Sequence, residues 1–304
     1  MIRFARTLQR HWDWRAAGNF VFGGTGGMLL ALAPFAGSDT AAMLATLAAL
    51  ALVGTGLLCV WLEIGRPWRA LNVFRHPQRS WMTREAFVAT VAFVLALSGL
   101  VLRSPALSWI AAAFGVAFVY CQGRILMASR GVPSWRPKEV VPLVLSTGLS
   151  EGSAVLVAAL VLQADGVPTW LAWLLAAAVL ARAFAWARYR AALVRDDAPA
   201  AAIALMQRMH PWLLAGGTAV PLVSVVGALF APADVAPPAA FFGAICALLA
   251  GWWFKFVLVT RASQLQGYAF GKLRSGHPLA RSRTAKQGRP GAAGFPEVLP
   301  GDNR

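Results

Sequence analysis

The chain has 304 residues, of which 58% are hydrophobic and only 13% are charged. Because soluble domains carry roughly 25% charged residues, this composition and the mean hydropathy of +0.60 exclude an ordinary soluble domain. The apolar runs fit membrane-spanning helices, since about 20 residues cross a hydrocarbon core about 30 Å thick. We therefore predict an all-α, polytopic membrane protein with eight transmembrane helices.

In chain order, a cytoplasmic N-terminal segment, residues 1–16, is followed by an eight-helix membrane domain, residues 17–260. Trp12 and Trp14 are placed as interfacial anchors. A basic tail rich in Gly and Pro, residues 261–304, is expected to be disordered and cytoplasmic. The polar stretch before the seventh span is expected to hold an amphipathic surface helix. The predicted spans cover about 17–35, 41–62, 85–102, 106–127, 140–162, 169–187, 211–230 and 239–260.

The formal net charge of +16 would indicate a nucleic-acid partner in a soluble protein. Here the charge is divided between two sets of loops. One set holds every loop Lys and Arg except Arg103, and the other holds only Asp39, Arg103, Asp165 and Asp234 as charges. Because basic loops stay in the cytoplasm, we predict that both termini are cytoplasmic and that no nucleic acid is bound.

The connection from Glu63 to Glu85 carries five arginines and a histidine between two apolar runs. Glu63 lies in a last helical turn, where the macrodipole disfavours an anion by about 0.3–1 kcal/mol. It either pairs with Arg66 on the surface or exchanges a proton with a lipid-soluble substrate. Glu85 follows Thr83, a plausible N-cap, so it serves either the helix start or proton exchange. His76 is either a solvated loop residue or a proton carrier near neutral pH.

Two charged residues stand out inside predicted spans: Glu151 in the fifth and Lys255 in the eighth. A lone charge at such depth costs about 2.5–3.5 kcal/mol on insertion scales. The two residues either pair with each other, or Lys255 extends to the surface. They also raise the alternative of a proton-coupled secondary transporter, although no repeated pair of interrupted helices supports it.

Redox ligands are scarce in this sequence. None of the four histidines lies inside a predicted span, so bis-histidine haem ligation has no candidates. The three cysteines are isolated in apolar runs and are expected to be small core residues. We predict no haem and no metal in this chain. Any metal centres would belong to other subunits. The residues concerned are His11, His76, His210, His277, Cys59, Cys121 and Cys246.

Two short motifs carry a family resemblance. The first is G-x-P-x-R-A at residues 65–70, after the second span, and the second is V-P-S-W at residues 132–135. With the eight spans and the carboxylate that opens the third, this pattern resembles the membrane-anchor subunit of dimethyl sulfoxide reductase. That family lies within the polysulfide reductase-like set of quinone-interacting membrane subunits.

The resemblance implies a bacterial inner-membrane protein that anchors a molybdopterin catalytic subunit and a four-cluster iron–sulfur subunit. It also implies a quinone site, for menaquinone or ubiquinone, facing the iron–sulfur partner. In the family a histidine and a glutamate flanking the central loop affect menaquinol handling. Glu85 matches that glutamate, whereas Glu63 occupies the histidine position. The resulting hypothesis is a quinone headgroup site formed by Glu63, Arg66, His76 and Glu85.

Orientation refines this expectation. In the family the central loop lies on the side of the catalytic subunits, and the charge rule places that loop in the cytoplasm. We therefore predict partners on the cytoplasmic face. The sequences E-I-G-R-P and S-W-M-T-R-E are similar to those of the sulfite dehydrogenase (quinone) and phenylacetyl-CoA:acceptor oxidoreductase anchors. Either complex would oxidise its substrate and deliver electrons to the quinone pool.

Overall fold

A computed structural model describes residues 8–9, 11–63, 78, 80–164 and 166–265. Within these ranges the regular elements are helices, and Leu8 forms an isolated β-bridge with Gln264. Eight helical segments are long and apolar enough to cross a membrane, which confirms the predicted all-α, eight-span architecture. Arg66, His76 and most of the tail lie outside the described residues.

Several spans are built from more than one element. The first, Trp14–Phe35, contains α1, η1, α2 and η2; the seventh, Ala200–Ala228, contains α8, η5 and α9. The bounds are α1 Trp14–Gly18, η1 Asn19–Gly23, α2 Gly24–Leu32, η2 Ala33–Phe35, α3 Asp39–Glu63, α4 Trp81–Val101, α5 Pro105–Ala128, η4 Pro133–Trp135, α6 Val140–Leu162, α7 Thr169–Arg195, α8 Ala200–Leu214, η5 Ala215–Ala219, α9 Val220–Ala228 and α10 Ala236–Thr260.

The prediction of a separate surface helix before the seventh span is wrong. That stretch is α8, which continues through Pro211 and the π-helical η5 into α9 as one membrane span. The seventh span was predicted to begin at Pro211. Proline usually breaks a helix because it lacks an N–H, but here Pro211 lies inside α8. The sixth span likewise extends to Arg195 and not to residue 187.

The third span also begins earlier than predicted, at Trp81. Its N-cap is Ser80, whose hydroxyl accepts the Thr83 N–H at 3.4 Å. Thr83 is therefore inside the first turn, and the prediction that it caps the helix is wrong. Glu85 consequently lies in the second turn of α4 and is not needed to start the helix.

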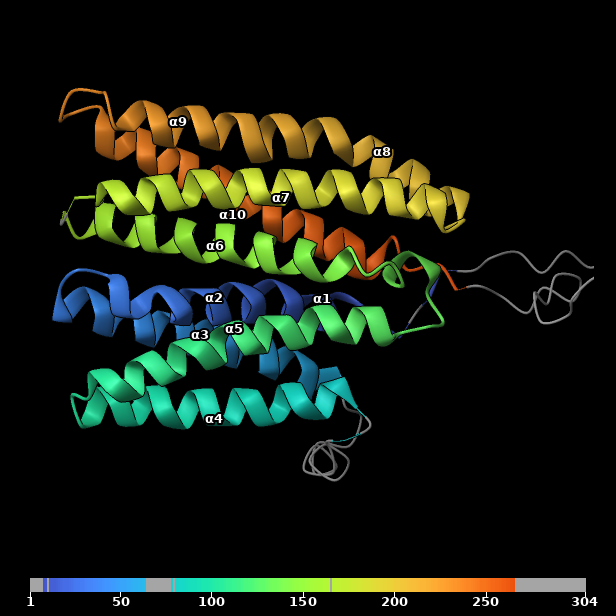
Figure 1. Cartoon of the computed structure of the whole chain (residues 1–304), viewed down its shortest axis with the longest axis horizontal. Coiled ribbons are helices and arrows are strands. Elements are labelled where there is room, and N and C mark those ends of the chain that lie inside the picture. The colour runs from blue at the N-terminus through green and yellow to red at the C-terminus, as the bar shows by residue number, and fades with distance from the viewer. Residues whose placement is uncertain (1–7, 10, 64–77, 79, 165, 266–304) are drawn as a thin grey trace, which may run out of the picture. The chain divides into compact units, whose positions relative to one another are not determined.

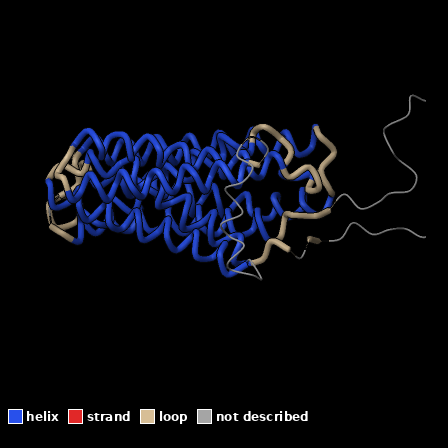
Figure 2. The backbone as a smooth tube through the Cα atoms, turned by 90° about the horizontal axis from the view of Figure 1, so that it is seen from below, coloured by secondary structure: helices blue, strands red, loops and turns tan. Residues whose placement is uncertain are grey.

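Within residues 8–265 the helices run side by side along one axis, with the described turns gathered at two ends (Figure 2). The first span is the most buried of the eight: α2 packs against α3, α5 and α6 (Figure 1). Its glycines permit this position. A Cβ on Gly26 would come within 2.7 Å of the Ala49 carbonyl oxygen, so the α2 and α3 backbones lie in direct contact, as small residues allow in membranes.

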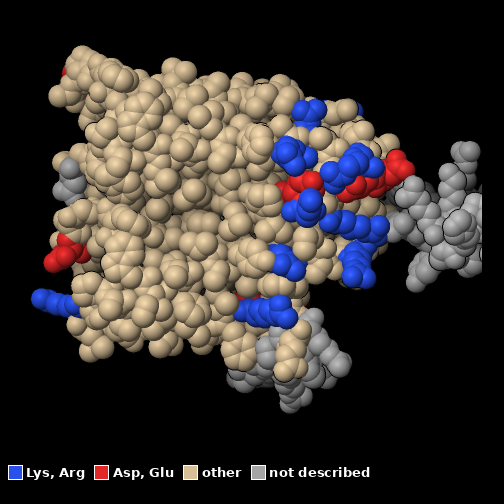
Figure 3. Space-filling model, viewed as in Figure 1, with Lys and Arg blue, Asp and Glu red and all other residues tan. Residues whose placement is uncertain are grey.

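The bundle is strongly asymmetric in charge. Arginines and lysines gather at the end that carries the start of the first span and the end of α10 (Figure 3). The described turns at the opposite end contain Asp39, Arg103 and Asp234 as charged residues. We refer to these as the basic end and the opposite end. The predicted alternation of charge therefore corresponds to two physical ends of the bundle.

The V-P-S-W motif has a clear structural role at the basic end. The Ser134 hydroxyl donates to the Ala262 carbonyl at 2.6 Å, and the Trp135 indole donates to the Leu258 carbonyl at 3.0 Å. Carbonyls in the last turn of a helix lack intrahelical donors, so η4 caps the end of α10. Tyr189 of α7 donates to the Ser134 carbonyl at 2.7 Å and holds the loop from the other side.

Candidate functional site near the basic end

Glu85 is buried where the first span, α4 and α5 meet. Its Oε1 accepts a hydrogen bond from Asn19 Nδ2 at 3.0 Å, and the Gln122 side-chain amide lies against the same carboxyl. Gln122 Nε2 also donates to the Asn19 carbonyl at 2.8 Å. The carboxyl group is thus held by two amides contributed by two other helices. Only 6% of Glu85 is exposed.

The amide that reaches Glu85 comes from a widened turn. Asn19 opens the π-helical segment η1, and single π-helical turns change the direction of side chains and free backbone groups, often at functional sites. Asn19 Oδ1 and Gln122 Oε1 are buried without a hydrogen-bond partner among the described residues. Two unpaired acceptors therefore lie within the same group of side chains as the Glu85 carboxyl.

Glu63 is the last residue of α3, and the end of α3 lies beside the start of the first span. Arg15 Nη1 donates to the Leu62 carbonyl at 2.8 Å, and Arg15, Asp13 and His11 are close enough to act electrostatically on Glu63. Arg15 therefore offsets the unfavourable macrodipole position of Glu63. The hydrogen bonds from Arg15 also hold the pKa of the half-buried Asp13 carboxyl below its usual range.

The first span places the two acids at similar depth. Arg15, beside the end of α3, and Asn19, beside Glu85, are four residues apart on it. Four helical residues rise about 6 Å, so the levels of Glu63 and Glu85 differ by about one helical turn. The structure thus brings both acids to the first span near the basic end. It shows no direct contact between them, and Arg66 and His76 lie outside the described residues.

Trp81, the first residue of α4, lies next to this site. Two guanidinium groups already lie over its ring, that of Arg84 at 4.3 Å from the centroid and that of Arg124 at 4.2 Å. Arg124 Nη1 also donates to the Tyr120 hydroxyl at 2.5 Å. Trp81 is therefore occupied by cation–π contacts, and it orders the cationic surface next to Glu85.

A buried ion pair lies deeper in the bundle. Lys255 Nζ of α10 is 2.5 Å from Glu151 Oε2 of α6, and their side chains are 1% and 0% exposed. The pairing predicted from sequence is present, and the alternative in which Lys255 extends to the surface is wrong. The Thr25 hydroxyl lies 2.8 Å from Glu151 Oε2 and accepts the Trp252 indole N–H at 2.9 Å.

Sequence reasoning missed a third buried charge, Arg182, at the middle of α7. Its Nη1 donates to Ser150 Oγ at 3.1 Å and to the Ala247 carbonyl at 2.9 Å, and its Nη2 donates to the Gly217 carbonyl. The available signal was a single arginine inside an apolar run. Arg182 lies inside the predicted sixth span, residues 169–187, but it was not singled out as a buried charge.

Pro221 explains why the Gly217 carbonyl accepts from Arg182. In an α-helix the N–H of residue 221 would bond to the carbonyl of residue 217, and proline has no N–H. The π-helical η5 covers this turn. A Cβ at Gly217 would lie 2.8 Å from the Ala250 Cβ and 3.3 Å from Arg182 Nη2. Glycine and proline together therefore create a buried acceptor for the guanidinium group.

The polar residues around Glu85 and those around the Glu151–Lys255 ion pair approach each other at Gly24. A Cβ on Gly24 would collide with both Lys255 Nζ and Gln122 Oε1, so these two atoms face the same point on the first span. Buried polar side chains thus follow one another from Glu85 through Asn19 and Gln122 to the ion pair. Within the described residues, no group of three or more His, Cys, Asp or Glu side chains is arranged to hold a metal ion.

The ion pair gives a direct stability prediction. Lys255→Met leaves the Glu151 carboxylate buried and unpaired, which costs about 3–5 kcal/mol, so we expect a large loss of thermal stability in detergent. The Lys255→Met/Glu151→Gln double variant should be more stable than Lys255→Met alone, because it removes the unpaired charge. Lys138→Met, at an exposed position, is the matched control and should change little.

The measurement is the thermal midpoint followed by size-exclusion chromatography for the wild-type chain, these three variants and the single variant Glu151→Gln. Additive losses of stability in the double variant would show that the two side chains are not coupled, and would contradict the pairing.

Comparison with known proteins agrees with this architecture. The family model described as DMSO reductase anchor subunit (DmsC) matches residues 17–207, from the first span into α8. No match is found among proteins of curated function. The matched region holds Glu63, Glu85, Glu151 and Arg182, whereas Lys255 lies beyond it. Because the match covers well over half of the chain, this protein belongs to the family of DMSO reductase anchor subunits.

Proposed function

We propose that this anchor subunit exchanges electrons and protons between an iron–sulfur partner and the quinone pool at a site beside Glu85. Membership of the family makes the chain a membrane-anchor subunit of a DMSO reductase-type complex. The quinone site, the individual partners and the substrate belong to the proposal. The observation that carries the quinone site is the buried Glu85 carboxyl held by Asn19 and Gln122 near the basic end.

The chemistry of quinone suits these residues. Reducing a quinone to a quinol consumes two electrons and two protons, and the reverse reaction releases them. A carboxyl within hydrogen-bonding reach of the ring oxygen can give or take a proton. The acceptor atoms Asn19 Oδ1 and Gln122 Oε1, unpaired among the described residues, suit the hydroxyl hydrogens of a quinol. Glu63, at the end of α3, is proposed to pass protons to solvent, with Arg66 and His76 as further members of the site.

The electrons are proposed to arrive from a four-cluster iron–sulfur subunit that also binds a molybdopterin catalytic subunit. The basic end, with Arg84, Arg124, Arg130 and Arg136, presents cationic side chains to which an acidic partner surface would bind. The positive-inside rule favours placing this end in the cytoplasm of a bacterium, with the complex bound there. This sidedness favours oxidation of a substrate confined to the cytoplasm, either sulfite or an organic compound such as phenylacetyl-CoA.

The transporter alternative depended on Glu151 and Lys255 as coupling groups. In the structure both side chains are enclosed and bonded to each other, and family membership supplies a different role for the chain. We therefore interpret the ion pair as a structural element of the bundle, which is consistent with an anchor subunit.

Glu85 provides the test of the proposed site. We expect Glu85→Gln to lower quinone-linked turnover of the assembled complex by about tenfold or more, because general acid–base groups contribute factors of about 10²–10⁴. Turnover with a water-soluble electron acceptor that reacts at the partner subunits should stay unchanged. Asp234→Asn, exposed at the opposite end, is the control. Unchanged quinone-linked turnover in a fully assembled Glu85→Gln complex would remove Glu85 from the site.

Sidedness is tested separately. Alkaline phosphatase, which is active only outside the cytoplasm, should be inactive when fused after Arg130 at the basic end. It should be active when fused after Arg103 at the opposite end, because the positive-inside rule keeps basic loops in the cytoplasm. The reverse pattern would place the partners on the outer side and exclude a substrate confined to the cytoplasm.

A further inference from the structure

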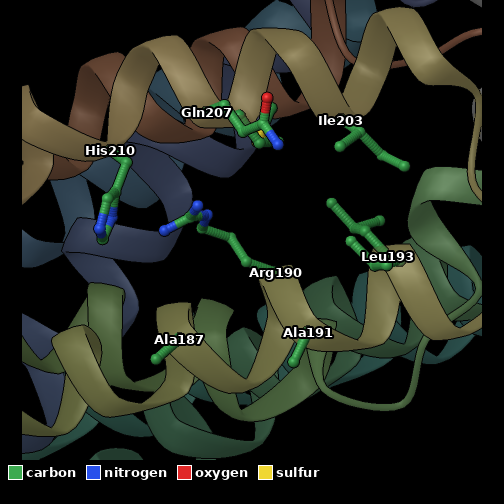
Figure 4. Close-up of a pocket in the computed structure, with 9 residues that line it drawn as sticks. Ala187, Arg190, Ala191, Leu193, Ile203, Gln207 and His210 are labelled. Atoms are coloured by element: carbon green, nitrogen blue, oxygen red, sulfur yellow. The ribbon is translucent and has the colours of Figure 1, made fainter.

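A groove of about 400 Å³ lies between α7 and α8, away from Glu85 and the ion pair. Its polar lining residues are Arg190, Gln207 and His210, and its apolar walls include Leu193, Ile203 and Met206. Figure 4 shows the Arg190 guanidinium from α7 and the His210 ring from α8 extending toward each other across it. The groove therefore combines hydrogen-bond donors with an apolar surface.

The His210 ring is fixed by a neighbour. The buried Trp186 indole donates its N–H to His210 Nδ1 at 3.0 Å. Because Nδ1 is the acceptor, a neutral His210 carries its proton on Nε2, so Nε2–H remains as a donor. The Arg190 guanidinium lies 6.0 Å from the centre of the Trp186 ring. The buried Trp186 thus contacts both the ring of His210 and the guanidinium group of Arg190, and it orients these two donors of the groove.

The electrostatics of the groove favour an anion. No ion pair joins Arg190 to a carboxylate of the described residues, and the other ionisable group lining the groove is His210. The flanking charged residues include Arg188 on α7 and Arg208 on α8. Asp196 and Asp197 lie in the turn between the two helices, where Asp196 pairs with Arg195. This turn belongs to the basic end, at the depth where lipid headgroups lie.

We propose that this groove binds the phosphate of an anionic phospholipid from the leaflet at the basic end. Arginine and a histidine N–H are suitable donors to phosphate oxygens, and Gln207 adds an amide. An acyl chain would lie along the apolar walls. Basic pockets between transmembrane helices at the headgroup level have this chemistry. A quinone headgroup uses similar donors, but it carries no charge to match the unpaired guanidinium.

The test uses the purified full chain in mixed vesicles of phosphatidylglycerol and phosphatidylcholine. After gentle extraction, native mass spectrometry should detect retained phosphatidylglycerol on the wild-type chain. We expect Arg190→Gln and His210→Ala each to reduce that retention at least about fivefold, since each removes one phosphate donor. Arg190→Lys should keep part of it. Arg188→Gln, which changes an exposed cation on the same helix, should keep all of it.

Three outcomes would overturn the proposal. Equal loss in Arg188→Gln and Arg190→Gln would mean that the attraction is a general effect of the basic surface. Displacement of the lipid by a short-chain quinone would assign the groove to quinone. No lipid retained by a wild-type chain that elutes as a single species would exclude a lipid site. None of these outcomes bears on Glu85, because the lipid site does not depend on the proposed quinone site.

Discussion

Burying charge inside a lipid-facing helix bundle is the constraint on which the rest of this structure depends. Glu151, Lys255 and Arg182 are each at most 1% exposed, and each must find partners because the hydrocarbon core offers none. The ion pair joins α6 to α10, and Arg182 joins α7 to η5 and α10. These bonds fix which helices are neighbours. Apolar packing alone would distinguish poorly between alternative helix arrangements in a membrane.

The same constraint explains the irregular helices. Gly217 of η5 and Pro221 of α9 together release a carbonyl that Arg182 requires. In η1, the widened turn directs Asn19 toward Glu85. Both π-helical segments therefore occur where a buried ionisable side chain needs a polar partner. The glycines of the first span serve the same purpose, because Gly24 leaves room for Lys255 and Gln122 to approach one point.

The sequence predicted the fold well because each element depends on local properties. Apolar runs gave all eight spans, and the division of loop charges matched the two ends of the bundle. The pairing of Glu151 with Lys255 followed from the cost of isolated charge.

The partners of Glu85 could not be predicted, because Asn19 and Gln122 reach it only through tertiary packing and a π-helical turn. Arg182 was visible in the sequence inside the predicted sixth span, but it was not singled out as a buried charge. The prediction of an amphipathic surface helix was wrong because the seventh span begins at Ala200 and not at Pro211.

The central claim is that quinone reaches the Glu85 carboxyl beside the first span near the basic end. Photo-crosslinking tests it most directly: a photoreactive quinone analogue is bound to the assembled complex in membranes, and the labelled peptides are mapped by mass spectrometry. The account predicts labelling of peptides that contain Asn19, Glu85 or Gln122, suppressed by excess native quinone. Specific labelling confined to the groove between α7 and α8, or to the opposite end of the bundle, would contradict it.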